Sequence, residues 1–305
     1  MAEIDLVKLF EEFGSEDKCR AYLEELRWPN GVECPRCQSK KISRIASRRQ
    51  FDCDSCRYQF SVRVGTLFHD SKLPLWKWFL AVYVMGESKK GVSANQLKRM
   101  LGVSYKTAWY LCHRIRSAMH DEAAPLLHGI VEADETYVGG KRTLSGPHTR
   151  REASRARFDN KTIVLGAIER GGKVRLRVSP TAEKEHVQAF LRDVVADEAE
   201  AIYTDSNRAY LGIEDEDTRH ESVNHAADEW VRGDVHTNTV ESVWSLFDRG
   251  VIGAYHKLSA KHLPAYLDEF AFRFNNRTNA FWFRDTIKRL VDGDTLTFDA
   301  LTSAK

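Results

Sequence analysis

The sequence predicts a multidomain protein in which a small cysteine-rich unit and a helical unit precede an α/β domain with a mixed sheet. Three observations lead to this fold class: two CxxC pairs near the start, a run of capped helices after them, and a series of β segments after Pro125. A chain of 305 residues is long enough for two or three separate cores. The expected parts are a helical segment over 1–30, the cysteine-rich unit over 31–65, the helical unit over 72–122, the α/β domain over 126–290 and a tail over 291–305.

Charge is distributed unevenly along the chain. The whole sequence has 46 basic and 44 acidic side chains, a net charge of +2, whereas residues 1–120 contain 21 basic and 13 acidic residues, a net +8. The front of the protein is therefore expected to bind an anionic partner. The N-terminus has acids where a signal peptide needs bases, and the longest apolar run, 78–85, is too short to cross a bilayer. We expect a cytoplasmic protein that does not bind membranes.

The cysteine-rich unit has the spacing of a metal site. Its four cysteines follow the order CxxC, fifteen residues, CxxC, and are Cys34, Cys37, Cys53 and Cys56. Two such pairs offer four thiolates to one tetrahedral zinc ion, and the strand-forming residues between them predict a zinc ribbon. An iron–sulfur centre with the same ligands is the alternative. The segment between the pairs is basic and contains Lys40, Lys41, Arg44, Arg48 and Arg49.

Residues 72–122 predict three helices, of which the last two form a helix-turn-helix. Ser93 is placed to cap a helix over 94–101, a Gly-Val-Ser turn follows, and the next helix is expected over 105–119. A helical hairpin without a nucleic-acid role is the alternative, but the adjoining basic ribbon favours DNA binding. The side chains expected to be exposed for phosphates and base edges in a major groove are Tyr105, Lys106, Arg114 and Arg116.

After Pro125 the pattern changes to strands. Three β segments are expected within 129–140, 161–172 and 173–180, then a helix within 183–199, a fourth strand within 200–210 and further helices. This order predicts a mixed sheet with helices packed on it. The segment 141–161 between the first two strands is polar and basic, and we interpret it as a loop that becomes ordered on DNA.

Two aspartates are expected to meet at one edge of this sheet. Asp134 lies in the first strand, and Asp205 ends the fourth. In a sheet of this order the first and fourth strands can be neighbours, which would bring the two carboxylates together. Two carboxylates at such a short distance repel each other unless a cation lies between them. Strand alternation also places Glu132 on the same face as Asp134.

Glu241 admits two interpretations. Read as a helix, the stretch from 235 to 251 places Glu241 at the border of an apolar stripe of Val240, Val243, Trp244, Phe247 and Val251. Glu241 can form a capping box with Asn238 as the N-cap. Alternatively, it points toward Asp134 and Asp205 and completes a site for two magnesium ions.

Four motifs together resemble a known family. The stretches "VEADETYVGGK", "YTDSN", "VRGDVHTNTVESVWSLFDRGVIGAYHKLSAKHL" and "DEFAFRFNNR" are similar to transposases of small bacterial insertion sequences, which join a zinc ribbon to a DDE-type RNase H-like domain. The resemblance extends from the ribbon to about Arg277. It implies Asp134 and Asp205 as metal-binding residues, with the third ligand in "NTVE". Because this position is a glutamate in some groups and an asparagine in others, Glu241 is our first choice and Asn238 our second.

The resemblance also implies cofactors and partners. It implies a structural zinc ion, two catalytic magnesium ions that manganese can replace, and activity in the bacterial nucleoid. The partners are double-stranded DNA, as element ends and as target, and a second copy of the chain or more. The residues expected to contact DNA are Lys40, Lys41, Arg48, Arg49, Tyr105, Lys106, Arg114, Arg116, Lys141, Arg142, Arg249 and Lys257.

One position departs from the family pattern. Relatives carry a lysine where this chain has Asp248, and an aspartate beside a carboxylate cluster weakens the approach of DNA by like-charge repulsion. Arg249 replaces that lysine only in part, since it projects about 100° further round the helix. Two alternatives to an active transposase therefore stay open. They are a metal-dependent nuclease without strand transfer and a former transposase that now binds or regulates DNA.

Overall fold

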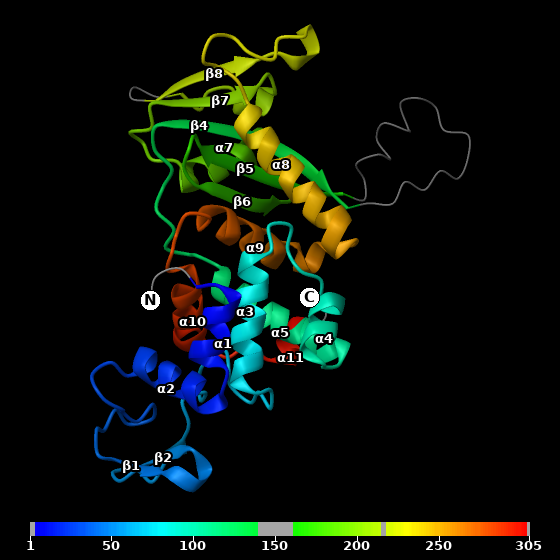
Figure 1. Cartoon of the computed structure of the whole chain (residues 1–305). Helices are drawn as coiled ribbons and strands as arrows, with labels where there is room; N and C mark the ends of the chain where they lie inside the picture. Colours follow the sequence, from blue (N-terminus) through cyan, green and yellow to red (C-terminus); the bar gives the residue numbers. More distant parts are fainter. Residues whose placement is uncertain (1–3, 140–160, 215–217, 304–305) are drawn as a thin grey trace. The chain divides into compact units, whose positions relative to one another are not determined.

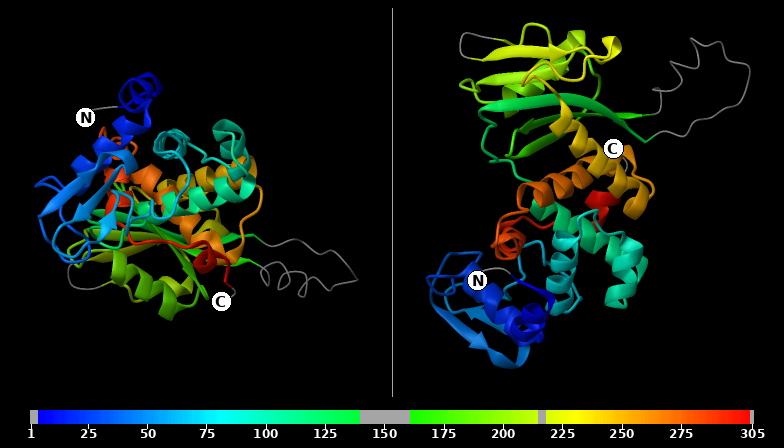
Figure 2. Two further views of the ribbon diagram at one scale, coloured as in Figure 1. Left: turned by 90° about the horizontal axis from the view of Figure 1, so that it is seen from below. Right: turned by 45° about the horizontal axis from the view of Figure 1, so that its top comes forward.

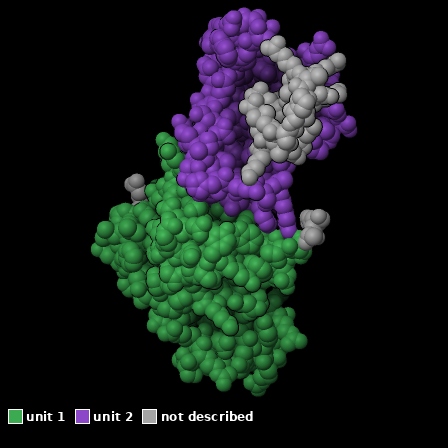
Figure 3. Space-filling view, turned by 90° about the vertical axis from the view of Figure 1, so that its right-hand side faces the viewer, with its two compact units in different colours: residues 1–120, 278–305 green, residues 121–277 purple. Residues whose placement is uncertain are grey.

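The computed structural model describes residues 4–139, 161–214 and 218–303. The chain forms two compact units, coloured separately in Figure 3. Unit 1 comprises residues 1–120 and 278–305, and unit 2 comprises residues 121–277. Most of the expected loop 141–161 lies outside the described residues.

The cysteine-rich part of unit 1 is a small antiparallel sheet. Its strands are β1 (Ile42–Ile45), β2 (Gln50–Cys53) and β3 (Gln59–Phe60), paired in that order. The turn between β1 and β2 contains a short 3-10 helix, η1 (Ala46–Arg48), and closes at Arg49 with a φ of 55°. Trp28, Phe51 and Phe60 pack against one another and form the apolar centre of this sheet.

The rest of unit 1 is helical. Ser93 and Ser104 cap two of the helices through their hydroxyl groups, and Gly102 ends the first of these with a φ of 61°. These caps set the predicted bounds, 94–101 and 105–119, which the structure reproduces. The helices of unit 1 are α1 (Leu6–Phe13), α2 (Glu16–Arg27), α3 (Leu75–Glu87), α4 (Ala94–Leu101), α5 (Tyr105–Met119), α10 (Trp282–Asp292) and α11 (Phe298–Thr302).

The α/β domain ends earlier than expected. The sequence predicted this domain to residue 290 and a tail after it, but α10 and α11 belong to unit 1. Phe283 of α10 packs on Phe13 of α1 and Phe79 of α3, with ring centroids 5.9 Å apart in both cases. A Cβ atom on Gly86 would lie 2.1 Å from the Trp282 ring, so this glycine allows α3 and α10 to approach. An amphipathic pattern predicts a helix but does not say which core buries it.

Unit 2 contains a five-stranded mixed sheet. The strands are β4 (Ile130–Val138), β5 (Thr162–Glu169), β6 (Val174–Ser179), β7 (Ala201–Asp205) and β8 (Arg219–Val223), in the order β6-β5-β4-β7-β8. β4 pairs antiparallel with β5 and parallel with β7, as the sequence predicted for the first and fourth strands. β8 was not predicted. Its sequence, RHESV, lacks the apolar alternation that identifies strands, because it lies at the edge of the sheet.

Helices cover both faces of this sheet (Figures 1 and 2). α7 (Lys184–Val194) packs on one face, with Phe190 and Leu191 against Val131 and Ala133 of β4. α8 (Asn238–Gly250) and α9 (Leu263–Asn275) pack on the other face. The remaining short elements are η2 (Arg208–Tyr210), η3 (His225–Ala227), the π-helix η4 (Val251–Tyr255) and η5 (Ala260–His262). Among the described residues, no helix has the length and apolar character needed to cross a membrane.

Candidate metal centres

The four cysteines form a compact cluster. Their Sγ atoms all lie within 4.8 Å of one another, and two of the distances, Cys34 to Cys56 and Cys37 to Cys53, are 3.6 and 3.5 Å. A tetrahedral zinc ion with Zn–S bonds of about 2.3 Å requires sulfur atoms roughly 3.8 Å apart. The donor set therefore fits one structural zinc ion. Lys40, Lys41, Arg48 and Arg49, which were predicted to contact DNA, are exposed in the segments that flank β1.

The helical residues predicted to contact DNA fall into two groups. Tyr105 and Lys106 are exposed at the start of α5, as predicted. Arg114 and Arg116 were predicted to be exposed, and this was wrong, because only 4% and 1% of these residues are accessible. Arg114 donates to the carbonyl oxygen of Leu296 and to the hydroxyl of Tyr110, at 3.2 and 2.6 Å. A local pattern cannot reveal an acceptor that lies 182 residues further along the chain.

The two aspartates lie on neighbouring strands, Asp134 in the middle of β4 and Asp205 at the end of β7. Ile130 of β4 pairs with Ala201 of β7, and continuing this parallel register places Asp134 opposite Asp205. Burial is the main cause that raises the pKa of Asp134 to about 7, and the nearby charges of Glu135 and Asp205 raise it further. Asp205 Oδ1 accepts a hydrogen bond of 2.9 Å from the backbone N–H of Asn207. The predicted approach of the first and fourth strands thus produces an interaction between the two carboxylates.

Trp244, in α8, forms a hydrogen bond with Asp134. Its indole Nε1 donates to Oδ2 of Asp134 at 2.9 Å. The ring fits there because residue 166, which pairs with Asp134 across β4 and β5, is a glycine, and a Cβ atom on it would lie 2.5 Å from the indole. The sequence predicted Trp244 as a core residue, and it is 7% exposed, but its hydrogen bond to the aspartate was not predicted.

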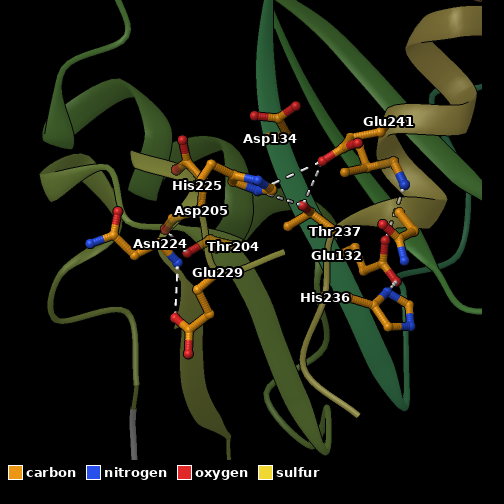
Figure 4. Close-up of polar contacts among 12 residues, drawn as sticks. Glu132, Asp134, Thr204, Asp205, Asn224, His225, Glu229, His236, Thr237 and Glu241 are labelled. Carbon is orange, nitrogen blue, oxygen red and sulfur yellow. Dashed lines mark hydrogen bonds and ion pairs between the residues drawn. The ribbon is translucent and has the colours of Figure 1, made fainter. Parts of the chain in front are cut away.

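Glu241 lies in the first turn of α8 and contacts two other side chains (Figure 4). Its Oε1 accepts a hydrogen bond of 3.0 Å from the Thr237 hydroxyl and lies 3.7 Å from His225 Nε2. The Glu241 side chain is 46% exposed, and His225 points toward it from the segment after β8. The imidazole of His225 packs edge-on against Trp230, at 4.4 Å between ring centroids.

The predicted capping box does not form. Thr237, not Asn238, is the N-cap residue of α8, and Asn238 is the first residue of the helix. Asn238 is exposed, and its carbonyl oxygen accepts a bond from the Ser242 hydroxyl. The predicted apolar stripe is correct, since Val240, Val243, Trp244 and Phe247 are all buried.

The three acids do not form a cluster of the kind that the cysteines form. Across the described ranges, the four cysteines are the one group of three or more His, Cys, Asp or Glu side chains placed to hold a metal ion. Asp134 and Asp205 interact electrostatically, whereas Glu241 contacts Thr237 and His225. Glu241 is therefore held by neighbours other than the two aspartates.

The other predicted DNA contacts are exposed where they are described. Arg249 and Lys257 are exposed after the third acid, while Lys141 and Arg142 lie outside the described residues. Burial raises the pKa of Asp248, and the positive charge of Lys161 acts in the opposite direction. Lys161 therefore supplies positive charge near Asp248.

Two acids near the aspartates, Glu135 half-buried and Glu132 buried, have roles that the sequence did not predict. Glu135 accepts hydrogen bonds from Asn207 Nδ2 and the Tyr210 hydroxyl, at 2.7 and 2.9 Å, and burial raises its pKa. Glu132 is completely buried on the face of β4 that carries Asp134. Strand alternation predicted the face on which Glu132 lies. It could not predict the hydrogen-bond partners of Glu132, because these lie more than 30 residues away in sequence.

Comparisons with known proteins show the family to which this chain belongs. Residues 126–275 match the family described as the ISXO2-like transposase domain, and residues 14–59 match the transposase zinc-ribbon domain. The chain is 35% identical over 276 residues to an uncharacterized protein in transposable element ISH50 of Halobacterium salinarum. That similarity covers 86% of this chain and 91% of the relative. The chain therefore belongs to the family of insertion-sequence transposases that join a zinc ribbon to an ISXO2-like transposase domain.

Proposed function

We propose that this protein cleaves DNA at the ends of its element and joins the freed ends to target DNA, using Asp134, Asp205 and Glu241 to hold magnesium. The observation that carries the proposal is the parallel register of β4 and β7, which sets Asp134 opposite Asp205 beside α8. Burial is the main cause of the raised pKa of Asp134, and the negative charges of Glu135 and Asp205 add to it, so the carboxylate lies where negative charge is disfavoured. A divalent cation bound by carboxylate oxygens relieves such repulsion.

Each residue of the site has a distinct part in this proposal. Asp134 and Asp205 supply oxygen ligands from the sheet, and Glu241 supplies a third from α8. Trp244 donates a hydrogen bond to Oδ2 of Asp134 and thereby fixes the orientation of that carboxylate. When bound, two magnesium ions stabilise the attacking and leaving oxygens of an in-line displacement at phosphorus. The protein then needs no covalent intermediate.

The order of the sheet supports an RNase H-like domain. Numbered within unit 2, the strands run 3-2-1-4-5, with the second strand antiparallel to both of its neighbours and the fourth and fifth parallel to the first. This order contains the neighbouring first and fourth strands that the sequence predicted. The carboxylates then belong to the first and fourth strands and to a helix that follows the fifth.

DNA is proposed to bind chiefly through unit 1. The exposed basic side chains of the ribbon and the exposed start of α5 support this, with α4 and α5 acting as a helix-turn-helix. Arg114 and Arg116 are not part of the proposal, because both are buried. Arg249, Lys257 and Lys161 would contribute from unit 2.

A strand-transfer assay tests the proposal. The full-length chain, its element's end sequences and a plasmid target are incubated with magnesium or manganese, and the Asp134→Ala variant serves as the matched control. We expect cleavage at the element ends and joined products from the wild type alone. Cleavage without joining of a pre-cut end would identify a nuclease. Binding without cleavage would identify a former transposase, for which Asp248 is the clearest sequence feature.

A further inference from the structure

Glu132 is a completely buried carboxylate that contacts the start of α8. It lies in β4, two residues before Asp134, and its exposed fraction is 0%. Its Oε2 accepts hydrogen bonds from the backbone N–H groups of Thr239 and Val240, at 2.7 and 3.1 Å. Its Oε1 accepts from the Thr239 hydroxyl at 2.8 Å. Strand β4 and helix α8 are thereby joined through one side chain.

Two basic side chains complete the surroundings of this carboxylate. Arg170 Nε donates to Glu132 Oε1 at 2.7 Å. His236 Nδ1 lies 3.2 Å from the same oxygen (Figure 4). Arg170 Nη2 lies 3.0 Å from His236 Nδ1 and donates to the His236 carbonyl oxygen at 3.2 Å. A buried carboxylate is costly unless its charge is paired and its oxygens accept hydrogen bonds, and here both conditions are met.

The N-cap residue of α8 makes no capping bond of its own. An N-cap threonine normally accepts a hydrogen bond from an N–H group of the first turn, but the Thr237 side chain makes no such bond. The two first-turn N–H groups of Thr239 and Val240 bind Glu132 instead. The Thr237 hydroxyl is consequently available to donate to Oε1 of Glu241.

We propose that Glu132 is a positioning residue for the third carboxylate. It caps α8 from the neighbouring strand, fixes the first turn of α8 against β4, and leaves Thr237 to orient Glu241. This inference rests on the proposed function, since it assigns Glu241 to the metal site. The negative charge is needed because the N-terminus of a helix carries partial positive charge and Arg170 adds a full one.

Glutamine cannot replace this carboxylate. The carboxylate accepts bonds at both oxygens, from two backbone N–H groups, one hydroxyl and one guanidinium. A carboxamide of the same shape has one acceptor oxygen, and its NH₂ group would face donors. Glu132→Gln therefore changes the hydrogen bonding and the charge while keeping the volume of the side chain.

Amide hydrogen exchange tests the cap without magnesium or DNA. In Glu132→Gln we expect faster exchange in peptides covering 237–243 and unchanged exchange in peptides of α9. Glu269→Gln is the matched control, because Glu269 is also 0% exposed, accepts a bond of 2.6 Å from the Tyr255 hydroxyl and pairs with Arg273. If exchange at 237–243 is as slow in Glu132→Gln as in the wild type, the cap is refuted.

Activity measurements test the positioning. Glu132→Gln should bind element ends with wild-type affinity but cleave them about 10- to 100-fold more slowly and require more magnesium for half-maximal rate, as seen when residues that orient metal ligands are changed. Glu269→Gln should keep the wild-type magnesium requirement. An unchanged magnesium requirement in Glu132→Gln would overturn the inference.

A milder variant covers the case in which Glu132→Gln does not fold. Thr239→Val removes one hydroxyl bond to Glu132 and keeps the shape of the side chain. In Thr239→Val we expect faster exchange at 237–243 and a higher magnesium requirement, both by less than in Glu132→Gln. If neither the exchange nor the magnesium requirement changes, the proposal is refuted. Failure of the proposed function gives a different result: the wild type would not cleave element ends, or Asp134→Ala would cleave them like the wild type, while the exchange measurement still tests the cap.

Discussion

The indole Nε1 of Trp244, in α8, donates a hydrogen bond of 2.9 Å to Oδ2 of Asp134, in β4. This bond and the cap from Glu132 join the same helix to the same strand at two points, one turn apart. The helix that carries Glu241 is therefore fixed relative to the strand that carries Asp134. Changes that loosen either point should affect the carboxylates before they affect the rest of the fold.

Trp244→Phe should alter the pH dependence of cleavage. The indole bond lowers the pKa of Asp134, so its loss should raise that pKa and move the pH of half-maximal activity upward. The smaller ring should also reduce the free energy of unfolding by roughly 1–3 kcal/mol. Single-turnover cleavage rates measured against pH will test this. A wild-type pH profile in the variant would show that the bond does not influence the aspartate.

Gly166→Ala should displace the indole. The new Cβ atom would lie 2.5 Å from the Trp244 ring in a buried position, which is closer than carbon atoms approach. We expect a loss of roughly 1–3 kcal/mol in the free energy of unfolding and a large loss of cleavage activity. Gly253→Ala is the control, since a Cβ atom there meets no described atom within 4 Å. Equal denaturation midpoints for the two variants would contradict the prediction.

Asp134→Asn should stabilise the magnesium-free protein in a pH-dependent manner. The folded protein holds the Asp134 proton up to about pH 7, whereas the ordinary pKa is 3.8. The folded state therefore binds more protons between these values, and the free energy of unfolding falls as pH rises through this range. Asparagine removes that loss, so the variant should be more stable by roughly 1–3 kcal/mol near pH 8 and nearly unchanged near pH 4. Urea denaturation in magnesium-free buffer at both pH values measures this, and equal stability near pH 8 would refute it.

Glu241→Ala and Asn238→Ala should differ sharply. The first removes a proposed metal ligand and should abolish cleavage and strand transfer while DNA binding survives. The second changes an exposed side chain at the first position of α8, which does not cap the helix, and stability should change by about 0.5 kcal/mol or less. Both variants are compared in the same strand-transfer assay. An active Glu241→Ala with an inactive Asn238→Ala would transfer the role of third ligand to the asparagine.

Cys53→Ser should release zinc and weaken DNA binding. Cys53 is completely buried, and its Sγ belongs to the four-cysteine cluster. We expect about one zinc ion per wild-type chain and substantially less in the variant, with unfolding of the small sheet. Unit 2 should keep its hydrogen-exchange pattern. Metal analysis and binding to element ends measure the effect, and full zinc content in the variant would contradict the assignment.

Local sequence signals predicted many elements of the fold. The bounds of α4 and α5 followed from serine caps and a glycine, and the apolar stripe of α8 followed from its periodicity. The neighbouring positions of β4 and β7 followed from the order of strands and helices. These features depend on residues a few positions apart or on simple rules of topology.

Features that depend on distant residues were missed. Arg114 was predicted to be an exposed basic side chain. It is buried, and the carbonyl oxygen of Leu296 accepts its hydrogen bond. The cap of α8 was assigned to Asn238, because the sequence cannot show that Glu132 reaches the first turn from 107 residues away. The edge strand β8 carries too few apolar residues to be recognised. Helix and strand periodicity contain no information on such pairings.

The return of residues 278–305 to unit 1 has a consequence for synthesis of the protein on the ribosome. Unit 2 is inserted into unit 1, so the core around Phe13 and Phe79 is completed only after Phe283 has been made. Unit 2 is complete on the ribosome before α10 and α11 have been made, so it can fold while unit 1 still lacks these two helices. Prematurely terminated chains would thus carry a unit 1 whose core is incomplete.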